Sequence, residues 1–153
     1  MRFEAGKTTV SLNFSFVAAV VLMLLLCDSG TVFICVFSSL FHECGHLFMM
    51  LLLGENPRSV IFGAFGIRIE RRTESILSYG KEVLIAHGGV FGNLILMLSA
   101  VVFYFLSESQ WSLQLLAVNG FIALFNLLPV KQLDMGRCLE YVVCQSENEE
   151  KSR

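Results

Sequence analysis

The sequence is poor in proline and in charge. Its 153 residues include two prolines, and charged residues make up 16% of the chain. The net charge is −2 and the lysines and arginines form no basic stripe. This excludes the electrostatic footprint of a nucleic-acid-binding protein, so no nucleic-acid partner is expected.

The cysteines lack a recognisable spacing. There are five, an odd number, and no two of them form a Cys-x-x-Cys pair. This pattern supports neither a disulfide framework nor a thiolate zinc site. We interpret them as small buried thiols. They are Cys27, Cys35, Cys44, Cys138 and Cys144.

What the chain has in abundance is apolar surface. Hydrophobic residues make up 55% of it and the mean hydropathy is +0.68, above the usual share of soluble domains. Four apolar segments approach the ~20 residues of helix that cross a bilayer. They cover residues 10–27, 31–53, 83–106 and 112–128. Because lipid cannot satisfy an open backbone, the sequence predicts an all-α membrane protein with four transmembrane helices.

The connecting segments predict orientation and domain organisation. Every lysine and arginine lies before the first segment, between the second and third, or after the fourth. The positive-inside rule then places both termini in the cytoplasm of a multi-pass cell-membrane protein. No small-x-small cleavage site follows the first segment, so we expect it to be retained. Residues 1–145 form one core, and residues 146–153 a disordered tail.

Residues 58–72, RSVIFGAFGIRIERR, differ from the apolar segments. Gly63 and Gly66 interrupt any helix, and apolar residues then alternate with charged ones. This alternation predicts a short β-hairpin at the membrane edge, between the second and third helices. An ordinary loop is the alternative, because isolated two-stranded pieces are marginally stable.

The strongest chemical signal is FHECGHL, residues 41–47, inside the second segment. His42 and His46 are four residues apart and share one face of a helix. With Glu43 they form the H-E-x-x-H pattern, in which two histidines bind zinc and the glutamate acts as general base. Ionisable residues inside a span are costly and usually functional. The alternative is a satisfied polar cluster or a proton or ion path.

A catalytic zinc needs a third protein ligand. The residues alone offer two candidates, His87 in the third segment and Asp134 after the fourth. Pro129 ends or kinks the fourth helix before Asp134. Irregular backbone at membrane depth is tolerated only against protein or a wet cavity, where a metal site would lie.

Three motifs carry a family resemblance. HECGH, then GGVFGN, then NLLPVKQLDMGR stand in the order and spacing found in the site-2 proteases, which are intramembrane zinc metalloproteases. The sequence resembles this family over about residues 31–137, in particular the bacterial branch of the stage IV sporulation protease. The resemblance implies Zn²⁺ as cofactor, His42, His46 and Asp134 as its ligands, Glu43 as base and Asn93 as an aid to the oxyanion.

The resemblance also implies a reaction and its partners. The chain would hydrolyse a peptide bond of a membrane-tethered protein substrate, releasing for example a transcription factor. The segment RSVIFGAFGIRIE resembles the family's membrane-edge strands, which hold the substrate extended. Met135-Gly136 replaces the usual double glycine, and His87 has no family role. The alternatives are an inactive relative that binds a membrane client, or a metal or proton transporter. The oligomeric state is not predicted.

Overall fold

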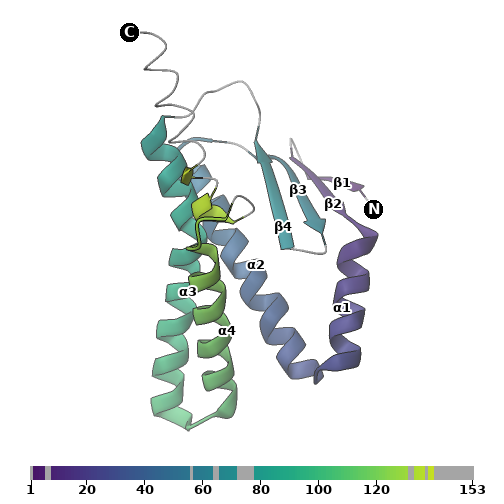
Figure 1. The fold of residues 1–153 in the computed structure, drawn as a ribbon, viewed down its shortest axis with the longest axis vertical. Coiled ribbons are helices and arrows are strands. Elements are labelled where there is room, and N and C mark those ends of the chain that lie inside the picture. Colours follow the sequence, from purple (N-terminus) through teal and green to yellow (C-terminus); the bar gives the residue numbers. More distant parts are fainter. Residues whose placement is uncertain are drawn as a thin grey trace.

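A computed structural model describes residues 2–5, 8–55, 57–63, 66–71, 78–130, 133–136 and 138–139. The predicted tail, residues 146–153, lies outside the described residues. Within them the chain forms four helices and one small sheet (Figure 1). The elements are β1 (Arg2–Ala5), β2 (Thr8–Leu12), α1 (Phe14–Leu26), α2 (Ser29–Leu52), β3 (Pro57–Gly63), β4 (Gly66–Arg71), α3 (Tyr79–Ser107) and α4 (Gln110–Asn126).

The helices differ in length. Among the described residues, α2 and α3 are long and apolar enough to cross a membrane. Helix α1 has 13 residues and α4 has 17, which correspond to about 20 and 26 Å at 1.5 Å per residue. Both are shorter than the ~30 Å hydrocarbon core. The four predicted helices are therefore present, and among the described residues two of them, α2 and α3, have the length and composition of a membrane span.

The predicted first span, residues 10–27, is wrong at its beginning. Strand β2 occupies residues up to Leu12, and α1 begins at Phe14. The sequence TTVSL in β2 is rich in β-branched residues, which favour strands. Strand β2 pairs with β3, and Val10 lies opposite Val60. The protein is therefore mostly helical but not all-α.

The four strands form one sheet in the order β1-β2-β3-β4. The outer pairs, β1–β2 and β3–β4, are antiparallel, and the central pair β2–β3 is parallel. The hairpin predicted over residues 58–72 is present as β3 and β4, which turn between Gly63 and Gly66. The sheet thus joins the chain before α1 to the chain after α2, beside the upper part of α2 (Figure 1).

Helices α2, α3 and α4 pack into a bundle. At Gly45 of α2 and Gly88 of α3 the two backbones touch, since a Cβ on Gly45 would collide with the Gly88 carbonyl. Small residues permit such close approach between membrane helices. Lys81, near the N-terminal end of α3, adds a second link: its Nζ donates to Leu53 O (3.2 Å) and to Glu55 Oε1 (3.0 Å).

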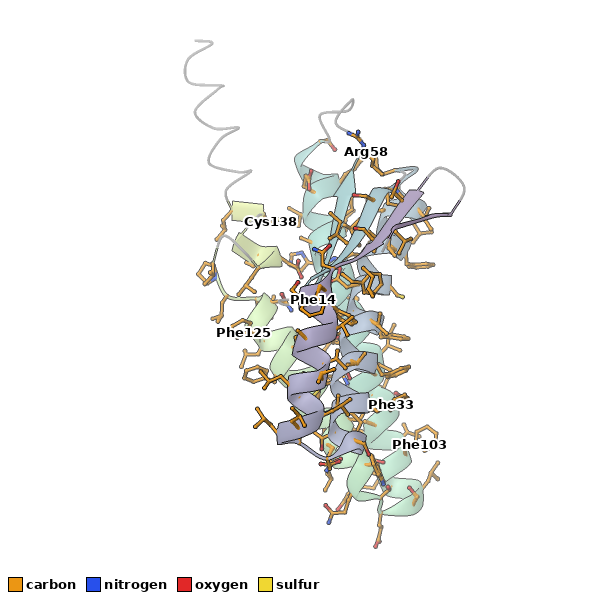
Figure 2. All side chains as sticks on the ribbon, turned by 90° about the vertical axis from the view of Figure 1, so that its right-hand side faces the viewer. Phe14, Phe33, Arg58, Phe103, Phe125 and Cys138 are labelled. Atoms are coloured by element: carbon orange, nitrogen blue, oxygen red, sulfur yellow. The ribbon has the colours of Figure 1, made fainter. Side chains whose placement is uncertain are left out.

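Helix α1 stands apart from this bundle. An apolar groove of about 600 Å³ lies between α1, α2 and α4, lined by residues such as Phe16, Leu40 and Phe121. On the outer surface many large apolar side chains are exposed, among them Phe33 and Phe103 (Figure 2). Such extensive apolar exposure is unusual for a soluble monomer and suits a lipid environment.

Candidate metal centre

The buried face of α2 carries the histidines. Ser38, His42 and His46 follow one another at four-residue intervals and are all buried, because residues one turn apart share a helix face. Asp28 begins this helix by accepting hydrogen bonds from Thr31 N (2.8 Å) and Thr31 Oγ1 (2.7 Å). Because the face that carries His42 and His46 is buried, both imidazoles point into the bundle.

Asp134 reaches the histidines from the segment that follows α4. Its Oδ2 lies 3.0 Å from His42 Nε2 and 3.1 Å from His46 Nε2, and the two Nε2 atoms are 3.1 Å apart. We call these three residues the His–His–Asp cluster. In a tetrahedral zinc site with ligand distances of about 2.0–2.1 Å, neighbouring ligand atoms lie roughly 3.3 Å apart. The cluster therefore has nearly the size of three ligands around one ion.

The charge state of Asp134 also suits a ligand. Burial alone would raise the pKa of its carboxyl group, but hydrogen bonds with His42 and His46 outweigh burial and hold that pKa below its usual range. The carboxylate form is the one that binds metals.

His46 is fixed in one tautomer. Its Nδ1 lies 2.7 Å from the backbone carbonyl oxygen of Ile85 in α3. A carbonyl oxygen only accepts, so Nδ1 carries the proton and donates it. In the neutral ring Nε2 then has a lone pair, directed into the cluster. A ring nitrogen held in this way by a partner outside the ligand set is typical of metal-binding histidines.

His42 contacts α3 through its other ring nitrogen. Its Nδ1 lies 3.2 Å from the amide nitrogen Nδ2 of Asn93, whose side chain is fully buried. The resemblance implied that Asn93 aids the oxyanion; the structure places its amide against a histidine of the cluster.

Helix α3 makes room for the cluster with a glycine. A Cβ on Gly89 would lie 2.5 Å from His42 Cε1 and Nε2 and from His46 Nε2, closer than real contacts allow. Gly89 belongs to the GGVFGN motif, but neither its contact with the histidines nor that of the Ile85 carbonyl was predicted from the sequence. Gly89 stands one helical turn before Asn93, and this spacing could have predicted that both residues lie on the same face of α3.

Glu43 and His87 lie beside the cluster. Glu43 follows His42 on α2 and is half-buried. His87 donates from Nδ1 to Val83 O, one turn back (2.8 Å), and it lines a small cavity together with Asp134 and Met135. Of the two candidate third ligands, Asp134 lies with His42 and His46, and His87 does not. Among the described residues this is the only group of three or more His, Cys, Asp or Glu side chains that could hold a metal ion.

A second buried polar contact lies one turn from the cluster and was also missed. Asn119 of α4 donates from Nδ2 to Ser38 Oγ at 2.9 Å, and both side chains are fully buried. Ser38 precedes His42 by four residues, so the helix period alone places it on the same face. The contact joins α4 to the histidine-bearing face of α2.

Fold and cluster together define a helical membrane-protein architecture with a buried candidate metal centre. Neither a known family model nor a curated protein sequence matches the chain. The structure is similar to the solved site-2 protease from Methanocaldococcus jannaschii, with a TM-score of 0.72 and 18% identity. The likeness covers 95% of this chain and 72% of that one. At this identity it establishes the fold alone, and it gives no support to the predicted sporulation branch.

Proposed function

We propose that the chain is a zinc-dependent intramembrane endopeptidase that cleaves a membrane-tethered protein substrate. One observation carries the proposal: Nε2 of two histidines and a carboxylate oxygen converge within 3.1 Å of one another. The His46 Nε2 lone pair is directed at this point because Nδ1–H donates to Ile85 O. Electron pairs brought so close repel one another unless a positive charge lies between them, which is supplied either by shared protons or by the metal ion that displaces them.

The donor set fits zinc, and the H-E-x-x-H pattern of residues 42–46 supports this choice of metal. Two imidazole nitrogens and one carboxylate oxygen leave a fourth tetrahedral position open, as in catalytic zinc sites. The chemistry that zinc supplies there is Lewis acidity toward a carbonyl group and toward water, whose pKa it lowers to about 7. Glu43, the residue after His42 on α2, would act there as the general base and acid that moves a proton from water to the departing amine.

The sheet supports a peptide as substrate. Strand β4 is an edge of the sheet, and an edge strand can pair with an extended peptide. Its Ile69 packs against Met50 and Ile85, and the Ile85 carbonyl in turn holds His46. Strand β4 is therefore linked to the cluster through one intervening residue, Ile85.

The depth of the sheet agrees with this role. From the turn at residues 27–28, α1 rises about 20 Å to Phe14, and α2 rises about the same distance to His42. The sheet adjoins the Phe14 end of α1 (Figure 1). A peptide added to it would lie near the level of the cluster, in the extended form that exposes its backbone.

One experiment tests the metal and the base together. Zinc per chain is measured in detergent-purified wild type, Glu43→Gln and Asp134→Ala, and cleavage is followed with labelled casein and a single-span reporter protein. We expect about one zinc and cleavage in the wild type. Glu43→Gln should keep zinc and lose cleavage, and Asp134→Ala should lose both. Cleavage by the Glu43→Gln variant would show that Glu43 is not the general base.

A second candidate function rests on Met135. This residue replaces a family glycine and lines the small cavity beside Asp134, where a bulky side chain crowds the approach of a substrate. The chain would then be an inactive relative that binds a membrane client. Zinc in the wild type without cleavage, and cleavage restored by Met135→Gly, would support this candidate.

A further inference from the structure

We infer that Asn93 is a positioning residue for the metal centre, which accepts a hydrogen bond from His42 Nδ1–H through its side-chain oxygen. The inference rests on the proposed function, and it assigns Asn93 a different role from the oxyanion contact that the resemblance implies.

The first observation is the burial of this pair. Asn93 is 0% exposed and His42 is 4% exposed. The Asn93 amide lies 3.2 Å from His42 Nδ1. Its Oδ1 is buried and has no hydrogen-bond partner among the described residues, as is also true of Asn119 Oδ1. In Asn119 the amide nitrogen donates to two oxygens, whereas in Asn93 it faces a histidine nitrogen. A buried amide oxygen without a partner costs free energy, so its orientation calls for an explanation.

The second observation concerns which ring nitrogen of His42 carries the proton. With Nδ2 facing the ring, the amide can only donate, and Nδ1 must be the acceptor. The neutral ring then carries its proton on Nε2. That proton would occupy the side of the ring that faces His46 Nε2 and Asp134, so His42 would have no lone pair for a metal.

Reversing the amide removes the conflict. The two ends of the asparagine side chain have the same shape, so a half-turn fills the same volume and exchanges the donor for an acceptor. Oδ1 then accepts from Nδ1–H and gains the partner that it lacks. His42 Nε2 is left with a lone pair directed into the cluster.

The reversed amide also gives the two histidines the same support. His46 donates from Nδ1 to the Ile85 carbonyl, and His42 donates from Nδ1 to the Asn93 side chain. Both acceptors belong to α3, a helix without a ligand of its own in the cluster. Metal-binding histidines are commonly held in this way, and loss of such a partner costs about 10–100-fold in metal affinity.

Two variants separate an acceptor role from a donor role. Asn93→Asp keeps the shape and offers only acceptors, whereas Asn93→Leu offers none. Zinc affinity of the detergent-purified chains is measured by competition with a chelating indicator. We expect Asn93→Leu to bind zinc about 10–100-fold more weakly and Asn93→Asp to bind it at least as tightly as the wild type.

The matched control is Asn119→Leu. Asn119 is the other fully buried asparagine of the described residues, and it bonds Ser38 rather than a histidine. Its substitution should leave zinc affinity within about twofold. An equal loss in both leucine variants would mean that any change of a buried asparagine weakens the bundle, and would overturn the inference.

A spectroscopic readout covers the case in which Asn93→Leu folds poorly. In histidine labelled with ¹⁵N, a protonated Nδ1 and an unprotonated Nδ1 have distinct chemical shifts. Zinc-loaded wild type and Asn93→Asp should both show His42 with a protonated Nδ1. An unprotonated Nδ1 in the wild type would contradict the inference directly.

The remaining outcomes distinguish this inference from the proposed function. Normal zinc affinity in both Asn93 variants, together with lost cleavage, would support the oxyanion role and overturn the inference alone. Loss of zinc from Asn93→Asp as well as Asn93→Leu would show that the amide donates, again overturning it alone. A wild type that binds no zinc would overturn both.

Discussion

His42 and His46 each use both ring nitrogens. Nε2 faces the His–His–Asp cluster, and Nδ1 faces α3, where Asn93 and the Ile85 carbonyl lie. The direction of each ring is thus set from outside the ligand set. Helix α3, which contributes no ligand of its own, therefore orients the two histidines of the cluster.

Gly89 lies where α3 comes nearest to both rings, and Gly89→Ala tests this closeness. The added methyl group would lie 2.5 Å from atoms of both imidazoles, so the rings must turn away and zinc affinity should fall at least tenfold. Chelator competition measures the change. Gly80→Ala is the control, since a Cβ there meets open space. Unchanged affinity in Gly89→Ala would show that α3 can withdraw without disturbing the cluster.

Between elements, α2 and α3 approach each other most closely at Gly45 and Gly88. The backbones touch there, between His42 and His46 in sequence. This explains the glycine within HECGH, which the zinc-binding pattern itself does not require.

Gly45→Ala should therefore destabilise the bundle. Its Cβ would collide with backbone atoms of Gly88 and not with a flexible side chain, and such overpacking costs about 1–3 kcal/mol. Thermal unfolding in detergent measures the loss. Cys44→Ala, at the neighbouring exposed position, should change stability by less than about 0.5 kcal/mol. Equal melting temperatures for both variants would mean that the two helices separate easily.

Elements with strong local signals were predictable. The helix expected over residues 31–53 is α2, Ser29–Leu52, and the one expected over 83–106 lies within α3, Tyr79–Ser107. The closeness of His42, His46 and Asp134 also followed from motif order, whereas their roles as ligands remain a prediction. Strand β2 was missed because its partner β3 is distant in sequence, and its apolar residues read as the start of a span.

The contacts around the histidines were not predictable for a different reason. Which ring nitrogen meets which acceptor depends on the rotation of α3 about its axis, and sequence spacing does not fix that rotation. The contact between Asn93 and His42 and that between Ser38 and Asn119 appear only once three helices are packed together.

In the whole molecule, the two ends of the bundle differ in character. The turns between α1 and α2 and between α3 and α4 lie at one end, and the sheet lies toward the other (Figure 1). Arg58, at the start of β3, projects at the sheet end (Figure 2). The positive-inside rule predicts that this end lies in the cytoplasm.

Cysteine labelling in intact cells tests that orientation. Cys27, exposed at the turn before α2, is kept as the single cysteine in one variant. In a second variant Arg58→Cys is the single cysteine. A membrane-impermeant maleimide added outside should label Cys27 and not the cysteine at position 58, because the two lie at opposite ends of α2. The reverse pattern would show that the chain is inserted the other way round.

The parallel pairing of β2 with β3 also sets an order of events during synthesis. Paired residues such as Thr9 and Ser59 are about 50 positions apart, and α1 and α2 both lie between them. At 5–20 residues per second a ribosome needs roughly 2.5–10 s to make that stretch. Throughout this interval β2 has no β3 to pair with. The sheet closes only after α1 and α2 have both been made, so its closure marks the completion of this helical hairpin.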